Sequence, residues 1–274
     1  MAKSFEFLEK NHPERIVCLT EEPTEILYSL GEGARIAGIS AYTVRPPEAK
    51  RDHPVVSAFI QGNIEKIVSL KPDLVIGFSD IQADLARDLI QRGLQVLIFN
   101  QRTLQEIFQV ILTIGGIVGK RERAVELCKG YEKNLLSIQA ETQKWEKRPR
   151  VYFEEWDDPR ISGIRWVSEL IEIAGGEDVF SEKSKGGLAK ERFVTDVEGI
   201  EKNPDVIVAS WCGKPVDRAS ILKRPGWETI SAIQDKEIYE IDSSLILQPG
   251  PACLTDGVQQ LFQIFKKWES KRRG

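Results

Sequence analysis

Short runs of apolar, mostly β-branched residues alternate along this chain with segments in which apolar residues recur at helical spacing. The runs typical of buried strands are residues 15–19, 74–76, 95–99, 150–153, 206–208 and 237–241. Two of the helical segments, residues 25–31 and 169–175, end in glycine, which readily adopts the left-handed conformation of a helix C-cap. Strands that alternate with helices predict parallel βαβ units, in which helices cover a mostly parallel sheet.

One stretch in the first half of the chain recurs in the second half. Residues 64–76 and 196–208, about 132 positions apart, each contain a short helical segment, a Pro-Asp turn and a β-branched run. Pro72 and Pro204 end the two helical segments, because proline restricts the residue before it and offers no N–H. The repeat predicts an α/β fold made of two similar, Rossmann-like lobes.

The segment between the two lobes predicts one long helix. Residues 120–147 contain no proline, a single glycine and apolar residues at helical spacing. A helix over this whole stretch would be about 40 Å long. We therefore expect an N-terminal lobe over residues 1–119, a connecting helix over 120–147 and a C-terminal lobe over 148–274, with a ligand cleft between the lobes. The alternative is a helical insertion that packs on one lobe only.

The composition excludes several classes of protein. Of 274 residues, 41% are hydrophobic and 29% are charged, and 42 acidic against 38 basic side chains give a net charge of −4. A nucleic-acid binder would show a clustered basic surplus, and no run of about 18 apolar residues predicts a membrane span. The N-terminus lacks the apolar core of a secretory signal. The sequence as it stands therefore predicts a cytoplasmic protein, or a periplasmic one if a signal has been removed.

No pattern in the sequence predicts catalysis or a bound metal ion. The two histidines, His12 and His53, both stand beside proline, and neither belongs to a metal-ligand pattern. The four cysteines lie far apart, and no nucleophile elbow or glycine-rich phosphate loop follows a predicted strand. We therefore expect a non-catalytic protein with no catalytic residues, no metal and no cofactor.

Aromatic and acidic residues follow several predicted strands, at the ends where ligands bind in open α/β sheets. Tyr42, Phe59 and Trp211 each follow an apolar run, and Trp156 lies in the acidic segment 154–158, after the first strand of the second lobe. Four aromatic side chains at strand ends predict the apolar walls of a binding cleft. The acidic segment has three interpretations: a loop that faces the ligand, a solvated capping loop, or a catalytic or metal site.

Three segments, residues 42–47, 56–59 and 63–76, resemble the helical-backbone (class III) periplasmic-type solute-binding proteins. The resemblance is strongest to the cobalamin-binding members. It extends from about Arg15 to Trp268 and is looser in the second lobe. Proteins of this family serve ABC importers of cobalamin, haem and iron–siderophore chelates. Their fold, two α/β lobes bridged by one long helix, agrees with the repeat described above.

The resemblance implies roles for individual residues. Tyr42 matches a family tyrosine that lies against the corrin ring, and Phe59 stands where cobalamin binders often have tryptophan. Trp156 lies in the loop that covers the other side of the ligand. The family tryptophan before the second-lobe helix has no counterpart, because residues 191–193 are Glu, Arg and Phe; Trp211 would compensate for it.

Docking of the family's proteins to a membrane permease uses one glutamate on each lobe. Glu65 matches the first of these, whereas the equivalent second-lobe position is Val197. Glu198 comes one residue late, which on a helix is a rotation of about 100°. The resemblance therefore implies a permease contact through Glu65 and Glu198, with Asp196 as an alternative, or a family member that no longer serves a transporter.

The sequence as a whole predicts a monomeric protein that binds cobalamin or a related corrinoid. The predicted ligand-binding residues are aromatic walls and polar side chains: Tyr42, Arg45, Phe59, Glu155, Trp156, Asp158, Trp211 and Gln248. The first alternative is a haem or iron–siderophore binder of the same fold. An anionic chelate would need a basic cleft, for which the candidates are Arg45, Arg160 and Arg165. The second alternative is a cytoplasmic regulatory or enzymatic module on the same fold.

Overall fold

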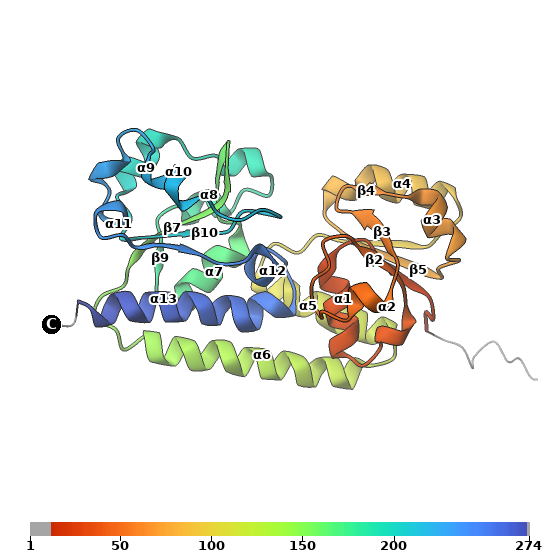
Figure 1. The fold of residues 1–274 in the computed structure, drawn as a ribbon. Helices are drawn as coiled ribbons and strands as arrows, with labels where there is room; N and C mark the ends of the chain where they lie inside the picture. The colour runs from red at the N-terminus through yellow and green to blue at the C-terminus, as the bar shows by residue number, and fades with distance from the viewer. Residues whose placement is uncertain (1–11, 273–274) are drawn as a thin grey trace, which may run out of the picture. The chain divides into compact units, whose positions relative to one another are not determined.

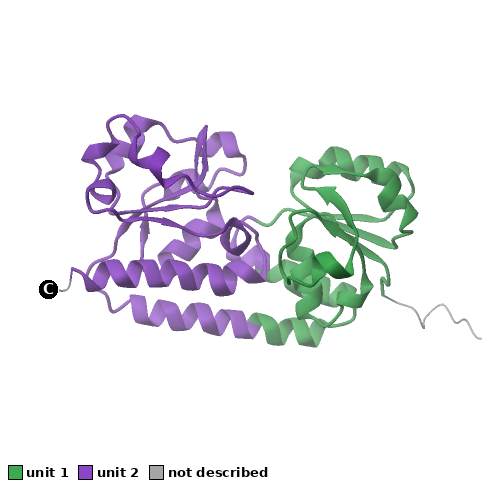
Figure 2. Ribbon diagram, in the orientation of Figure 1, with its two compact units in different colours: residues 1–101, 108–128 green, residues 102–107, 129–274 purple. Residues whose placement is uncertain are grey.

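The computed structural model describes residues 12–272 and divides the chain into two compact units (Figures 1 and 2). Unit 1 comprises Met1–Gln101 and Phe108–Cys128, and unit 2 comprises Arg102–Ile107 and Lys129–Gly274. Residues 1–11, which hold most of the segment used to predict the cellular location, lie outside the described residues. Between residues 12 and 272, no helix combines the length and the apolar character needed to cross a membrane.

Unit 1 is built on a six-stranded sheet. Its strands are β1 (Ile16–Cys18), β2 (Ile36–Ser40), β3 (Val55–Ala58), β4 (Gln61–Gly62), β5 (Leu74–Phe78) and β6 (Val96–Phe99). They lie in the order β4-β3-β2-β1-β5-β6, and every neighbouring pair is parallel except β3 and β4. The strand order runs outward from β1 in both directions, so the topological switch point, where open α/β sheets bind ligands, lies between β1 and β5.

Helices cover both faces of the unit 1 sheet (Figure 1). They are α1 (Glu21–Ser29), α2 (Ala49–Asp52), α3 (Ile64–Ser69), α4 (Ala83–Gln91) and α5 (Leu104–Ile117), which begins in unit 2. On one face, Ile67 of α3 and Leu89 of α4 pack against Val17 and Val75 of the sheet. The β-branched runs predicted as strands therefore form the core of this unit.

Unit 2 is built on a second, five-stranded sheet. Its strands are β7 (Arg150–Asp157), β8 (Arg160–Ser162), β9 (Glu177–Asp178), β10 (Val206–Ala209) and β11 (Ile238–Glu240). The order is β11-β10-β7-β8, and β9 also pairs with β7. Pairing is parallel except between β7 and β8, which form an antiparallel hairpin. The predicted fold class, two similar α/β lobes with mostly parallel sheets, is confirmed.

Within the described residues, seven α-helices come after β7 in the sequence of unit 2: α7 (Arg165–Ile173), α8 (Ser181–Ser184), α9 (Asp196–Lys202), α10 (Arg218–Leu222), α11 (Ser231–Gln234), α12 (Ser243–Ile246) and α13 (Val258–Ser270). A π-helical turn, Cys253–Gly257, leads into α13. One face of the sheet buries an aromatic core. There, the ring of Tyr152 on β7 meets those of Phe180 and Trp227, with centroids 5.3 and 6.0 Å away.

The long helix α6 (Arg121–Thr142) has residues in both units and is shorter than the sequence pattern predicts. Its 22 residues correspond to about 33 Å, whereas the pattern extends to residue 147. The hydroxyl of Thr142 donates to the carbonyl of Ile173 at 3.0 Å, and Trp145 stacks on Phe262 with ring centroids 6.0 Å apart. The chain leaves the helix to bury Trp145, a tertiary contact that helical periodicity does not reveal.

The sequence repeat corresponds to equivalent elements of the two units. The first copy folds into α3 and β5, and the second folds into α9 and β10. The residue before each proline, Lys71 or Asn203, has a left-handed backbone with φ of +49° or +38°. Gly31 and Gly175 follow α1 and α7 with φ of +78° and +93°, as predicted for left-handed C-caps.

Candidate binding site

Apolar side chains gather after the carboxyl ends of β2, β3 and β5 in unit 1. Tyr42 and Val44 follow β2, and their side chains are 48% and 45% exposed. Phe59 and Ile60 follow β3, and Ile81 follows β5; Phe59 is half-buried, and the other two are exposed. Because the carboxyl ends of parallel strands meet at one edge of a sheet, these five side chains share that edge. We call them the unit 1 edge.

The backbone that carries this edge is held in place by a buried glutamine. Phe59 and Ser79 have φ of +53° and +73°, a region that non-glycine residues occupy only where the surrounding structure holds them. The side-chain carbonyl of Gln82, which is fully buried, accepts from the backbone N–H of Phe78 at 3.0 Å. Its amide donates to the carbonyl of Phe59. Gln82 thus links the loop after β3 to the loop after β5.

Two buried glutamates follow β1 at the start of α1. Glu21 and Glu22 are 9% and 3% exposed. Burial, together with the neighbouring charge of Glu21, raises the pKa of Glu22 to about 8. The hydroxyl of Thr20 donates to Glu22 Oε1 at 2.9 Å. Burial therefore favours the neutral form of the Glu22 carboxyl at pH 7.

In unit 2, a buried ion pair lies in the middle of β7, where the neighbouring strand β10 ends. Glu154 is fully buried and accepts two hydrogen bonds from Arg224, at 2.6 and 2.8 Å. The hydroxyl of Tyr152 and the indole N–H of Trp211 also donate to this carboxylate, at 2.9 and 3.1 Å. Trp211, predicted as a ligand wall, is 3% exposed and lies in the aromatic core, because Glu154 holds its indole there.

The next residue of β7, Glu155, is bound by a second arginine. Its oxygens lie 2.5 and 3.0 Å from the guanidinium nitrogens of Arg192, whose side chain is 3% exposed. Arg192 also donates to the carbonyl of Ser162 on β8. The carboxylate of Glu155, predicted to face the ligand, therefore anchors the segment before α9 to the hairpin and is 20% exposed.

Three apolar side chains form a row across the β7–β8 hairpin. Trp156 pairs with Ile161, and Ile161 forms an antiparallel bridge with Phe193. Directly opposed residues of neighbouring strands project from the same face of a sheet. Phe193 is 41% exposed, while Trp156 and Ile161 are partly buried. We call these three residues the apolar row; Phe193 was not predicted as a ligand-binding residue, although its segment stands where the family's tryptophan is missing.

The remaining predicted ligand-binding residues lie on separate loops. Arg45, after β2, pairs with Glu25 of α1 at 3.0 Å. Asp158 is exposed, and its carbonyl accepts from the indole N–H of Trp156 at 3.0 Å. Gln248, after α12, is half-buried, and its carbonyl accepts from the N–H of Gly250. The structure thus brings Tyr42 and Phe59 to the unit 1 edge, and Glu155, Trp156 and Asp158 to one hairpin of unit 2.

The two predicted docking glutamates differ in their surroundings. Glu65 is the second residue of α3, is 73% exposed and pairs with Arg92 at 2.5 Å. Glu198 forms a capping box with Thr195 at the start of α9. Its hydrogen bond from Lys183, at 2.7 Å, is the main cause that lowers the pKa of its carboxyl. Val197, which stands at the unit 2 position equivalent to Glu65, is 62% exposed.

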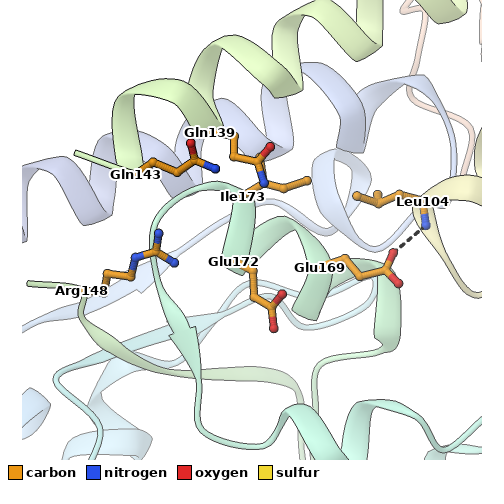
Figure 3. A pocket seen from close by; sticks show the side chains of 7 residues that line it. All are labelled: Leu104, Gln139, Gln143, Arg148, Glu169, Glu172 and Ile173. Atoms are coloured by element: carbon orange, nitrogen blue, oxygen red, sulfur yellow. Dashed lines mark hydrogen bonds between the residues drawn. The ribbon is translucent and has the colours of Figure 1, made fainter. Parts of the chain in front are cut away.

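A groove of about 430 Å³ lies among the helices of unit 2 (Figure 3). It is lined by Leu104, Gln139, Gln143, Arg148, Glu169, Glu172 and Ile173. Arg148 precedes β7, and Glu172 stands near the end of α7, so the groove lies apart from the carboxyl ends of the strands. Within the part of the chain that the structure describes, no group of three or more His, Cys, Asp or Glu side chains is placed to hold a metal ion.

Known proteins share this arrangement of strands and helices. The sequence profile of the periplasmic binding proteins matches residues 16–245. The chain belongs to the periplasmic binding protein family. The predicted resemblance to solute-binding proteins is thereby confirmed. Because this family consists of substrate-binding proteins rather than enzymes, the chain is a substrate-binding protein.

Three known proteins illustrate what this chain is similar to. YvrC of Bacillus subtilis, named as an uncharacterized ABC transporter substrate-binding lipoprotein, is 30% identical over 261 residues, which cover 92% of this chain and 80% of YvrC. The vitamin B12-binding protein BtuF of Vibrio cholerae has a TM-score of 0.72 and 25% identity, over 93% of this chain and 97% of BtuF. The haem-binding protein RhuT of Roseiflexus sp. RS-1 has a TM-score of 0.76 and 24% identity, over 92% and 98%.

Proposed function

We propose that this protein is the substrate-binding component of an ABC importer and that its ligand is cobalamin or a related corrinoid. The observation that carries this proposal concerns the three arginines that could recognise an anionic chelate. Each of them is paired with a carboxylate: Arg45 with Glu25 at 3.0 Å, Arg160 with Asp196 at 2.9 Å, and Arg165 with Glu169 at 3.2 Å. Each of the three guanidinium groups therefore already has a carboxylate partner within the chain.

Arginines that are already paired suit an uncharged ligand that bears amides better than an anionic ligand. An anion that bound Arg160 would compete with Asp196, and the cost of removing the anion from water would not be offset by an unpaired cation. The unit 1 edge and the apolar row each offer apolar contact area to a flat macrocycle. A corrinoid combines apolar ring faces with amide side chains, which matches both properties.

The similarity to YvrC, BtuF and RhuT supports a role as the binding component of an importer. It leaves two ligands to compare. BtuF is named for vitamin B12, and RhuT is named for haem. Haem carries two carboxylates, for which a binding site needs cations or several hydrogen-bond donors. The pairing of the arginines therefore favours the corrinoid.

Titration with cyanocobalamin tests the proposal. We expect saturable quenching of tryptophan fluorescence and a rise in the unfolding temperature, since a ligand that binds the folded state stabilises it. Tyr42→Ala should weaken binding, because it removes an exposed ring of the unit 1 edge. Ile90→Ala is the control, because this side chain is 58% exposed on α4 and lies outside that edge.

Haemin and a ferric hydroxamate chelate are titrated in the same way. No quenching and no stabilisation by cyanocobalamin at high micromolar concentration would refute the corrinoid. Saturable binding of haemin or of the ferric chelate in its place would assign the protein to the corresponding ligand.

For docking to the permease, we propose Glu65 as the contact in unit 1. Its 73% exposure leaves the carboxylate accessible, and its partner Arg92 is also largely on the surface. In unit 2, Glu198 is held by its capping box and by Lys183, which makes it a poorer contact. Glu65→Lys should reduce ligand uptake through the cognate permease and leave ligand binding unchanged. Unchanged uptake would remove Glu65 from the docking surface.

A further inference from the structure

Lys214 is placed by a tight turn at the carboxyl end of β10. Its backbone N–H donates to the carbonyl of Trp211 at 3.3 Å, and Gly213 between them has φ of +75°. Glycine adopts this conformation without the strain that a side chain would add. β10 lies beside β7, with Ala209 opposite Glu154. The turn therefore returns Lys214 toward the end of β7.

The ammonium group of Lys214 lies over two indole rings. Its Nζ is 4.2 Å from the centroid of the Trp156 ring and 4.9 Å from that of Trp211. It also bonds to Oδ1 of Asp157 at 2.6 Å. Trp211 is buried, whereas Trp156 packs against the aromatic core and keeps part of its surface exposed. Lys214 therefore covers one face of the indole that a ligand could reach.

From this geometry we propose that Lys214 determines ligand specificity by capping Trp156. In the ligand-free protein the ammonium occupies the indole face, and a flat ligand stacks there only by displacing it. The inference rests on the proposed function, because it takes a ring as large as a corrin as the ligand. Asp157 neutralises the ammonium, so Lys214 is not offered to an anionic group of the ligand.

The cap selects for ligands with a large apolar ring. Displacing an ammonium from indole rings removes a cation–π interaction, which weakens binding by about 2- to 30-fold. A macrocycle offsets this loss through the apolar area that it buries, whereas a small or strongly polar molecule does not. Removing the cap should therefore tighten binding of the macrocycle.

Three variants separate the charge of Lys214 from its bulk, with cyanocobalamin as the probe. Lys214→Ala removes the cap and should bind about 2- to 30-fold more tightly than the wild type. Lys214→Met keeps a side chain of similar length without charge and should show a smaller gain. Lys214→Arg keeps a cation that stacks on indoles at least as well, and it should bind no more tightly than the wild type.

Quenching by acrylamide measures the cap without any ligand. Acrylamide should quench the fluorescence of Lys214→Ala more than that of the wild type. When Trp156 is replaced by phenylalanine, the proteins with Lys214 and with Lys214→Ala should be quenched equally, because Trp211 is buried. The unfolding temperature of each variant shows whether the fold is kept.

The outcomes separate this inference from the proposed function. If Lys214→Ala binds cyanocobalamin more weakly than the wild type, the lysine contacts the ligand and the inference is overturned. Equal affinities also overturn it. If the wild type and all variants fail to bind cyanocobalamin, the proposed function and the claim of specificity fall together. Unchanged acrylamide quenching in Lys214→Ala shows in either case that the cap does not exist.

Discussion

Arg224 holds Glu154 through two hydrogen bonds inside unit 2, 2.6 Å from Nη1 to Oε2 and 2.8 Å from Nη2 to Oε1. The side chain of Glu154 is fully buried and that of Arg224 is 8% exposed. The guanidinium also lies 4.5 Å from the centroid of the Trp227 ring. The two residues are 70 positions apart, so the pair ties the middle of β7 to the segment after α10.

Removing one partner of this pair should destabilise the protein strongly. In Arg224→Met, Glu154 stays buried without its counter-ion, so we expect the free energy of unfolding to fall by about 3–5 kcal/mol. Unfolding in urea, followed by circular dichroism, measures this loss.

A matched substitution at an exposed pair is the control. Arg87 pairs with Asp84 on α4 at 2.8 Å, and their side chains are 60% and 87% exposed. Arg87→Met should therefore cost less than about 1 kcal/mol. A loss for Arg224→Met no larger than that for Arg87→Met would contradict a structural role for the buried pair.

Gly115 and Gly116 are neighbours on α5 with opposite surroundings. A Cβ on Gly115 would lie 2.4 Å from the Cβ of Ala124 on α6, whereas a Cβ on Gly116 would have nothing within 4 Å. Gly115→Ala should therefore push the two helices apart and cost about 1–3 kcal/mol. Gly116→Ala should stabilise the protein by about 0.5–1 kcal/mol, because alanine loses less backbone entropy in a helix.

Thermal unfolding of the two glycine variants is the measurement. The unfolding temperature should fall for Gly115→Ala and rise for Gly116→Ala. Shifts in the same direction would contradict the close approach of α5 and α6 at Ala124.

The strands and helix ends of this protein could be predicted because they depend on local patterns. The β-branched run after Pro72 becomes β5, and glycine at position 31 adopts the left-handed conformation that ends α1. Both follow from backbone preferences within a few residues. The end of α6 at Thr142 could not be predicted in this way, because it depends on the burial of Trp145 against Phe262, far along the chain.

The partners of the site residues could not be predicted for the same reason. Glu155 meets Arg192, 37 positions away, only because the β7–β8 hairpin and the bridge from Ile161 to Phe193 bring the two segments together. From the sequence alone, Phe193 is only an aromatic residue in the segment where the family's tryptophan has no counterpart. Lys214 carries no local signal beyond the glycine before it, since its contacts with Trp156 depend on the register between β7 and β10.

Glu22 should make the stability of the protein fall as pH rises. Burial raises the pKa of its carboxyl from 4.5 to about 8 in the folded chain. Between these two pH values the folded chain holds a proton that the unfolded chain has released. The free energy of unfolding therefore decreases with rising pH, by at most about 1.4 kcal/mol per pH unit from this group.

Glu22→Gln removes this contribution. Compared with the wild type, the variant should unfold at a similar urea concentration below pH 4.5 and at a higher one near pH 8. Glu201→Gln changes an exposed glutamate of α9 and should leave the pH dependence as it is in the wild type. Parallel pH profiles for the wild type and Glu22→Gln would show that the Glu22 carboxyl is already ionised in the folded chain.

Phe193 should contribute to ligand binding, although the sequence resemblance gives it no role. It is 41% exposed and continues the apolar row from Ile161 and Trp156. Phe193→Ala removes apolar contact area worth about 1–2 kcal/mol, so the affinity for cyanocobalamin should fall roughly 10-fold. Phe193→Leu keeps much of this area and should show a smaller loss, measured in the same fluorescence titration.

Val197→Ala is the control for Phe193, because it truncates another apolar side chain close by in the sequence. Val197 is 62% exposed on α9, outside the apolar row. Its truncation should change the affinity by less than about twofold, since no ligand contact is expected there. Equal affinities for Phe193→Ala and Val197→Ala would place the ligand away from the apolar row and leave the unit 1 edge as its main apolar contact.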